Sequence, residues 1–200
     1  MEFAKVDDTT GVLTFNRWPG IEISPSDIAT AASKFGLREP SSADIKLGRK
    51  IAAEKIHPGV AHAEEYERVA NHSGICSLVY REGSDVTGMM AMLLLNAAGH
   101  MALRDGSFDA QHPSLSHLAE PGDLVSAGYG WGFVALTKEA GRAVVGATDG
   151  LRQQFFRPID VYTRAATPDG VRVLEGLLGY RAVPWTEQTG LIWIPAEKKA

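Results

Sequence analysis

The spacing of hydrophobic residues changes near residue 74 and divides the chain into an N-terminal helical part and a C-terminal mixed part. Before that point, apolar residues recur three and four positions apart between Pro and Gly breakers, a pattern that predicts helices. A short strand at the start is the exception. The expected elements are a strand at Val12–Phe15 and helices at Ser24–Phe35, Ser42–Ile56 and His62–Ala70.

After residue 74, short β-branched and aromatic runs predict strands, and longer amphipathic runs separate them. A turn at residues 83–85 joins the first two strands into an antiparallel hairpin, and the Gly- and Pro-rich segment Gly99–Asp123 is expected to be a long loop. The expected strands are Ile75–Tyr80, Val86–Leu95, Leu124–Leu136, Ile159–Thr163 and Leu191–Ile194, and the expected helices are Thr137–Phe155 and Pro168–Leu178. Strands that alternate with helices predict an α/β (α+β) fold with a mixed central sheet flanked by helices. We expect residues 1–73 to pack on the same domain as the core at 74–200.

Composition and charge narrow the class of protein. Hydrophobic residues make up 44% of the 200 and charged residues 22%, as in ordinary globular proteins. A net charge of −4 gives no basic field for a phosphate backbone, so we expect no nucleic-acid partner. The N-terminus lacks the pattern of a secretory signal, and the apolar stretch Val86–Ala98 is too short to span a bilayer. With the single cysteine Cys76, these features favour a cytoplasmic protein without a membrane partner.

Three glycines share one face of the strand that ends at Leu136. Side chains alternate along a strand, so Gly128, Gly130 and Gly132 lie opposite the aromatic residues between them. Glycine weakens a strand, and it is typical of strands whose backbone is closely approached by a packed helix or by a ligand. The strand by itself does not distinguish the helix from the ligand. Thr137 is then a candidate N-cap for a helix, and helix N-termini have unpaired amides that suit a phosphate group.

The residues that follow resemble a known family. Lys138-x-x-Gly141-x-Ala143 after an apolar strand is similar to the Q/R-x-x-G-x-G/A signature of the GNAT superfamily of N-acetyltransferases. The strand Ile159–Thr163 and the helix that leads to Leu178-Gly179-Tyr180 resemble the second motif of that family. The hairpin, the two motifs and the last strand stand in the family's order, so the resemblance covers roughly residues 74–195.

The resemblance implies an acyl-CoA-dependent N-acyltransferase. It implies acetyl-CoA, or another acyl-CoA, as co-substrate, no metal, and a small-molecule or protein amine as acceptor; a homodimer is compatible with it. The backbone at Phe133–Ala135 would pair with the pantetheine arm, and the amides from Lys138 to Val144 would hold the pyrophosphate. The implied cofactor-binding residues are Phe133, Val134, Ala135, Lys138, Glu139, Ala140, Gly141, Arg142, Ala143 and Val144. Arg142 would add a charge-assisted contact, whereas Glu139 would repel a phosphate unless it points away.

Three departures from the family pattern bear on catalysis. Glu175 stands where many members have the tyrosine that protonates the leaving thiolate, and it could serve as the acid only if it were buried and protonated. Pro168 stands where an asparagine is common, and the strand Leu124–Leu136 has no carboxylate to serve as a base. Two other interpretations therefore stay open, a non-catalytic acyl-CoA-binding or regulatory module and an α/β domain whose glycines serve only packing. For Gly146 and Gly150 we favour packing.

Other chemistry finds little support in the sequence. The pairs His57/His62 and His112/His117 lack the helical spacing of metal ligands, so we expect surface or loop histidines and no metal site. Either residue of the second pair could still enter an active site from the long loop. Cys76 alternates with its neighbours in a predicted strand and is expected to be a core residue. No nucleophile elbow, P-loop or dinucleotide fingerprint occurs.

Overall fold

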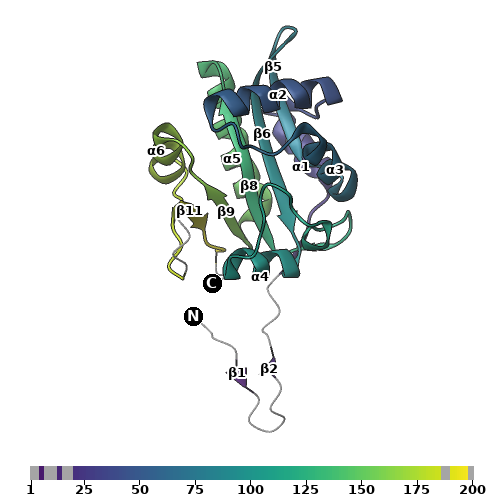
Figure 1. Ribbon diagram of the computed structural model, residues 1–200, viewed down its shortest axis with the longest axis vertical. Coiled ribbons are helices and arrows are strands. Elements are labelled where there is room, and N and C mark those ends of the chain that lie inside the picture. Colours follow the sequence, from purple (N-terminus) through teal and green to yellow (C-terminus); the bar gives the residue numbers. More distant parts are fainter. Residues whose placement is uncertain (1–4, 7–12, 15–19, 186–189, 198–200) are drawn as a thin grey trace.

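A mixed seven-stranded β-sheet forms the centre of the molecule (Figure 1). The computed structural model describes residues 5–6, 13–14, 20–185 and 190–197. The strands of the sheet are β4 (Leu37–Arg38), β5 (Ser77–Glu82), β6 (Asp85–Leu95), β8 (Ala127–Ala135), β9 (Asp160–Arg164), β10 (Arg181–Ala182) and β11 (Leu191–Ile194). Their order is β10-β11-β9-β8-β6-β5-β4, and every neighbouring pair is antiparallel except β8 and β9. The predicted mixed central sheet is confirmed.

Two pairs of short strands lie outside this sheet. β1 (Lys5–Val6) pairs with β2 (Leu13–Thr14), and β3 (Ile21–Glu22) pairs with β7 (Leu124–Val125). β2 lies within the predicted strand Val12–Phe15, whose end residues are outside the described part of the chain.

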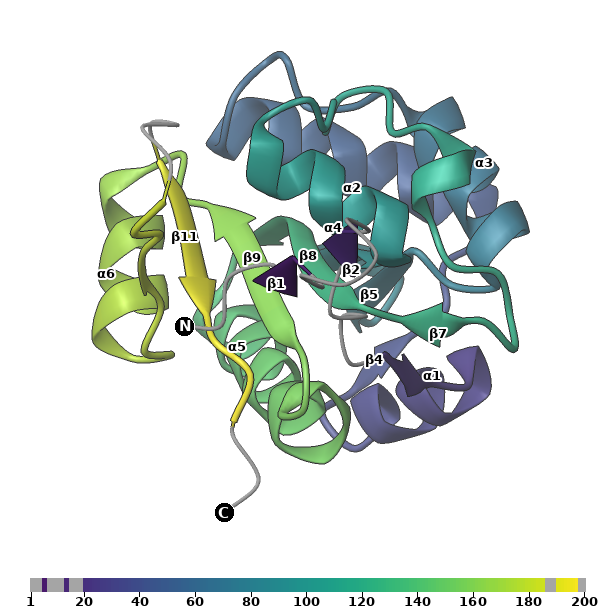
Figure 2. The ribbon, with the colours of Figure 1, turned by 90° about the horizontal axis from the view of Figure 1, so that it is seen from below.

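In the described part of the chain six α-helices flank the sheet, and Figure 2 shows α2, α3 and α4 on one face with α1 and α5 on the other. They are α1 (Pro25–Ser33), α2 (Ser42–Lys55), α3 (Ala63–Ser73), α4 (Ala97–Asp105), α5 (Lys138–Leu151) and α6 (Pro168–Gly176). A 3-10 turn at Leu115–His117 and a π-helical turn at Arg152–Phe156, directly after α5, complete the helical elements of the described chain. Within the same residues, no helix combines the length and apolar character that crossing a membrane requires.

Side chains and glycines at the helix ends explain the boundaries. Ser41 and Asp44 form a reciprocal capping box at the start of α2, in which each side chain bonds to the other residue's backbone N–H. Thr137 and Thr167 cap α5 and α6 by accepting from the backbone N–H three residues on. Gly74 ends α3 in the left-handed conformation that glycine adopts without strain.

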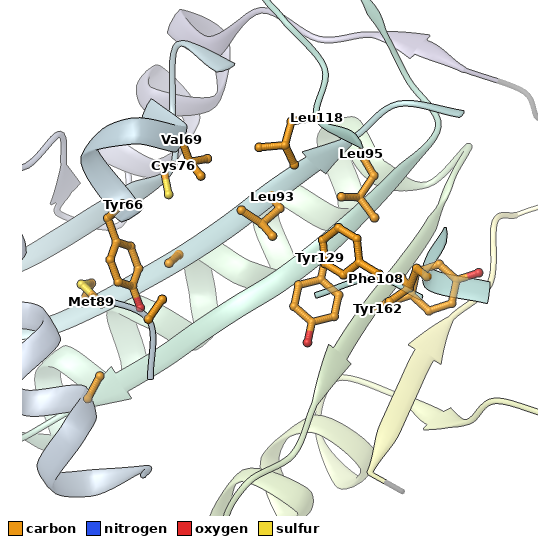
Figure 3. Close-up of a cluster of buried hydrophobic side chains, with 14 of the residues drawn as sticks. Tyr66, Val69, Cys76, Met89, Leu93, Leu95, Phe108, Leu118, Tyr129 and Tyr162 are labelled. Atoms are coloured by element: carbon orange, nitrogen blue, oxygen red, sulfur yellow. The ribbon is translucent and has the colours of Figure 1, made fainter. Parts of the chain in front are cut away.

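The sheet separates two hydrophobic layers. On the α2–α4 face, Tyr66 and Val69 of α3 meet the sheet residues Leu93 and Tyr129, while Phe108 follows α4 (Figure 3). The layer under α1 and α5 contains the other face of β6, with Met90, Met92 and Leu94. Both faces of β6 are thus covered, as its continuous apolar sequence predicts.

Two sequence expectations are wrong. The predicted loop Gly99–Asp123 begins inside α4, where Asn96 caps the helix by accepting from Gly99 N–H at 3.0 Å. Gly99 is required there because a Cβ would collide with the backbone carbonyl of His117. The predicted strand Leu124–Leu136 is divided at Ser126, whose N–H donates to the Leu95 carbonyl at 2.7 Å. The part before this residue, β7, pairs with β3, and the part after it, β8, belongs to the seven-stranded sheet.

Candidate functional site

The C-terminal part of β8 has no hydrogen-bonded neighbour strand on the side where β9 lies in the described chain. β8 and β9 pair in parallel only from Ala127–Asp160 to Gly130–Thr163. The Thr163 hydroxyl donates to the Gly130 carbonyl at 2.8 Å, where this pairing stops. Residues 131–135 of β8 continue along β6 without a partner strand on the other side in the described chain. We call residues 131–135 the open edge of β8.

Two residues of the open edge direct their backbone groups away from β6. Leu136 N–H donates to the Thr87 carbonyl of β6 at 2.8 Å. Alternate residues of an antiparallel strand bond to the same neighbour, so Val134 also faces β6, while Phe133 and Ala135 face the side that β9 has left. These two residues therefore offer N–H and C=O groups to an extended ligand.

Two residues, Leu136 and Thr137, separate the open edge from the start of helix α5. The Thr137 hydroxyl accepts from Ala140 N–H at 3.1 Å and donates to the Glu82 carboxylate at 2.6 Å. Gly141 N–H donates to the Thr137 carbonyl at 2.9 Å, and this is the hydrogen bond that closes the first turn of the helix. The N–H groups of Lys138 and Glu139 belong to the first turn, which has no acceptors within the helix. The phosphate-binding amides expected from Lys138 to Val144 thus reduce to these two, because Ala140 N–H bonds to the Thr137 hydroxyl and the amides from Gly141 onward bond to carbonyls one turn earlier.

The glycines near this site fall into two groups. A Cβ on Gly146 or Gly150 would lie 2.9 or 2.6 Å from the Phe35 ring, so both glycines serve packing against this residue just after α1, and not against the sheet. A Cβ on Gly141 would meet only Ala135 Cβ at 3.9 Å, and one on Gly132 would meet nothing within 4 Å. Packing does not explain these two glycines, and their lack of a side chain keeps space open beside the edge.

The charged residues of the first turn are exposed and partly paired. Arg142 and Glu139 lie 3.7 Å apart as an i,i+3 ion pair, with both side chains mostly exposed. Glu139 is therefore held beside Arg142 on the helix surface. Such a pair contributes little stability, so a phosphate could displace the carboxylate from Arg142.

The other predicted cofactor-binding residues divide by burial. Val134, Ala140, Ala143 and Val144 are buried against the sheet and can contribute no side chain to a ligand. Lys138 is exposed, and Phe133 and Ala135 are partly buried. The cofactor role of all ten residues stays a prediction.

Glu175 lies on the exposed face of α6, and its neighbour Leu174 is the residue of that helix that packs inward. The burial that would keep a glutamate protonated is therefore absent at this position. The tyrosine that ends the motif, Tyr180, is buried, and burial raises the pKa of its hydroxyl. Neither residue supplies an evident acid at the open edge.

On the α2–α4 face, the open edge begins at Trp131, which is an extra residue in the strand. Ala91 of β6 pairs with Gly132 and Met92 pairs with Gly130, so Trp131 forms a β-bulge. Its ring lies 4.4 Å from that of Tyr66, and its Nε1–H donates to the Ala110 carbonyl at 2.6 Å. This bond connects the bulge to the segment that follows α4.

A polar pocket lies next to that connection. It is lined by residues from α2, from the link between α2 and α3, and from the segment after Ala110, among them Arg49, His62, Gln111 and His112. Gln111 Nε2 donates to the Gly59 carbonyl at 3.1 Å and joins the two walls. His112, one of the two histidines considered from sequence, thus lies in a pocket.

A buried polar network, which the sequence did not predict, connects α4 with β9. His100 Nε2 lies 2.9 Å from the Tyr162 hydroxyl, and Tyr162 donates to Asp160 Oδ2 at 3.0 Å. Burial, and then the positive charge of Arg104, lower the His100 pKa to about 4, so the imidazole is neutral near pH 7. The partners are 62 residues apart, so no local motif marks them.

Cys76 and the first pair of histidines lie where the sequence predicts. Cys76 is buried, and burial raises the pKa of its thiol, which makes it a core residue. His57 and His62 are exposed, and among the described residues no group of three His, Cys, Asp or Glu side chains is placed to hold a metal.

No family model matches the chain, and no curated protein matches its sequence.

Proposed function

We propose that the chain is an acyl-CoA-dependent N-acyltransferase of the GNAT type, with acetyl-CoA or another acyl-CoA as the donor. One observation carries the proposal: β8 loses its parallel partner at Gly130 and runs as an open edge directly into the N-terminus of α5. An extended arm with a phosphate at its end matches this arrangement, because the edge offers strand pairing and the helix offers unpaired amides.

The residues at the open edge fit an acyl-CoA in two further respects. The backbone groups of Phe133 and Ala135 point to the free side of the strand, as pairing with pantetheine amides requires. Gly132 and Gly141 leave open space where a side chain would obstruct the arm or the pyrophosphate. The hairpin, β8, α5, β9, α6 and β11 also follow one another in the order that the resemblance to the family implies.

The reaction would be a direct attack of a neutral amine on the thioester carbonyl. The N–C bond forms as the C–S bond breaks, the amine loses a proton, and the coenzyme leaves as a thiol. Positioning of the two reactants and hydrogen bonds from backbone amides to the carbonyl oxygen would supply the rate enhancement. The strand β8 has no Asp or Glu, so the proton passes to water or to a group on another element.

The acceptor would approach from the face that contains Trp131 and Tyr66. The bulge turns this part of β8 toward the segment after α4, and the polar pocket at His62 and His112 lies beside it. The rings of Trp131 and Tyr66 would contact the apolar part of such an amine, and the polar side chains of the pocket would bind its polar groups.

A non-catalytic acyl-CoA-binding module is the second candidate function. It is favoured by the exposure of Glu175 and by the absence of a carboxylate on β8, which leave no acid or base at the open edge itself. Binding without turnover would need the same open edge and helix N-terminus.

Release of free thiol from acetyl-CoA in the presence of a panel of amines tests the proposal. The transferase account predicts release that requires an amine and yields the N-acylated product by mass spectrometry. Binding of acetyl-CoA without release for any amine would favour the binding module. If neither acetyl-CoA nor longer acyl-CoAs bind, both candidates are wrong.

A further inference from the structure

The polar pocket on the α2–α4 face has basic and amide side chains in its wall. Its cavity volume is about 100 Å³, which leaves room for a small polar group, since a single water molecule already fits into about 10–15 Å³. In the described chain no Asp or Glu lines this pocket. The polar side chains that line it are those of Arg49, His62, Gln111 and His112. A pocket with this lining favours an anionic group.

Arg49 supplies the permanent positive charge of the pocket. Its Nε donates to the Ala61 carbonyl and its Nη2 to the Pro58 carbonyl, both at 3.4 Å, which is long for a hydrogen bond. Within the part of the chain that the structure describes, this half-buried guanidinium forms no ion pair, and its Nη1 has no hydrogen-bond partner although it is not fully buried. Arg49 can therefore accept a further anionic partner.

Two nearby carboxylates are already bound by other groups. Glu65 lies 3.9 Å from His112 Nδ1, but its Oε2 accepts from the Nε and Nη2 of Arg68 at 3.1 and 2.6 Å. Asp109 accepts from the backbone N–H groups of Gln111 and His112 at 2.8 and 3.2 Å. These bonds hold one wall of the pocket in place, so a ligand would bind there at a lower ordering cost.

Trp131 joins the pocket to the open edge of β8. Its indole donates to the Ala110 carbonyl at 2.6 Å, and the next residue, Gln111, lines the pocket. The centroids of the Trp131 and Tyr66 rings are 4.4 Å apart. Burial raises the pKa of the Tyr66 hydroxyl and the Arg49 charge opposes this shift, so the guanidinium lies near the same pair of rings. A molecule bound to Arg49 would therefore lie beside the first residue of the open edge.

An anion in this pocket would belong to the acceptor and not to the donor. Helix α5, whose first turn is proposed to hold the pyrophosphate, lies on the opposite face of the sheet from α2 and α3 (Figure 2). The phosphates of the donor are thus expected away from Arg49. The acceptor, in contrast, is proposed to approach from the face that contains Trp131.

We propose that the pocket is a carboxylate-binding site, and that the acceptor is an amine that carries this carboxylate, as an amino acid does. This inference rests on the proposed acyltransferase function. A planar guanidinium suits a carboxylate because two of its N–H groups can donate in parallel to the two oxygens. The amine nitrogen forms an amide with the thioester carbon as the C–S bond breaks, the amine loses one proton, and the coenzyme leaves as a thiol. The carboxylate takes no part in that step and only orients the acceptor.

N-acetylphenylalanine and N-acetylphenethylamine are matched probes, because they resemble the product, differ only in the carboxylate and contain no titrating amine. Calorimetric titration of the full chain is expected to show tighter binding of the acid, by roughly tenfold to a hundredfold for a charge-assisted pair. Arg49→Met should abolish this preference. Lys50→Met is the matched control and should retain it, because it removes one positive charge from the next residue of α2, which is exposed and does not line the pocket.

A second variant decides the test if Arg49→Met does not fold. Gln111→Glu places a carboxylate on an exposed part of the pocket wall, so it should weaken binding of the acid and leave binding of N-acetylphenethylamine unchanged. Equal binding of the two probes by the unchanged protein would overturn the inference. A preference that survives Arg49→Met, is undiminished in Gln111→Glu or is lost in Lys50→Met would overturn it too, as would displacement of the acid by coenzyme A.

Turnover separates this inference from the proposed function. With acetyl-CoA as donor, phenylalanine is expected to have a higher kcat/KM for thiol release than phenethylamine, and the ratio should fall in Arg49→Met. The change in this ratio between the two proteins does not depend on the basicity of the amines. If both amines are acylated equally well and the two probes bind alike, only this inference fails. If no amine is acylated while the acid still binds in preference, the proposed function fails and the carboxylate site stands without its role for an acceptor.

Discussion

The neutral, buried imidazole of His100 should make the stability of the fold depend on pH. His100 is 1% exposed, and its Nε2 is 2.9 Å from the Tyr162 hydroxyl. Burial and the charge of Arg104 lower its pKa from 6.5 to about 4 in the folded protein. In the unfolded chain the imidazole returns to its ordinary pKa. Acid therefore protonates the unfolded state first.

The sign and size of the effect follow from this difference. Above pH 6.5 both states are neutral at His100, and the full stability is present. As the pH falls from 6.5 to 4, the unfolded state binds the proton and the folded state does not, so the fold is destabilised. A shift of this size corresponds to about 2 kcal/mol lost at pH 5 and about 3 kcal/mol below pH 4.

Urea unfolding between pH 8 and pH 5 measures this loss, with His100→Gln to isolate it and His112→Gln as an exposed control. The free energy of unfolding of the unchanged protein is expected to fall by about 2 kcal/mol more than that of His100→Gln over this range. The His112→Gln variant should follow the unchanged protein. Equal pH dependence in His100→Gln and the unchanged protein would refute the reasoning, and would mean that Asp160, 3.6 Å away, stabilises the protonated imidazole.

Three further substitutions test the packing around the site. Gly150→Ala should lower the free energy of unfolding by roughly 1–3 kcal/mol, because its Cβ would lie 2.6 Å from the Phe35 ring; a stabilised variant would contradict this. Gly141→Ala should raise the free energy of unfolding by up to about 1 kcal/mol, because the new Cβ has open space and alanine favours a helix. Destabilisation of this variant in urea would show that packing requires the glycine. Trp131→Phe removes the donor to the Ala110 carbonyl, so it should cost about 1 kcal/mol and speed amide hydrogen exchange after α4; unchanged exchange would mean that the bond does not hold this segment.

Elements with a strong local pattern could be predicted from the sequence. The apolar run of β6 predicts a buried strand from its own sequence. The strand predicted at Leu191–Ile194 is confirmed with the same bounds as β11. The start of α5 follows from Thr137, whose hydroxyl is the cap that a helix N-terminus needs.

Features that depend on contacts between distant segments could not be predicted. Helix α4 contains Gly99, which by itself indicates a loop, and only the approach of the His117 backbone explains it. The end of the β8–β9 pairing at Gly130 and the pair formed by His100 and Tyr162 likewise join segments separated by more than thirty residues. Sequence reasoning identified the strand and helix of the candidate site, and the family resemblance implied a ligand-pairing backbone at Phe133–Ala135, but the residue at which β9 leaves β8 could not be predicted.

Calorimetric titration of coenzyme A into the unchanged protein, Gly141→Glu and Gly176→Glu tests the central claim most directly. Gly176 is a matched control, because it is an exposed helix glycine with no atom within 4 Å of its Cβ position, on α6 instead of α5. The account predicts that the unchanged protein and Gly176→Glu bind with the same affinity and that Gly141→Glu does not bind, because a carboxylate would occupy the space kept for the pyrophosphate. Equal binding by all three proteins, or none by the unchanged protein, would contradict a coenzyme site at the open edge of β8.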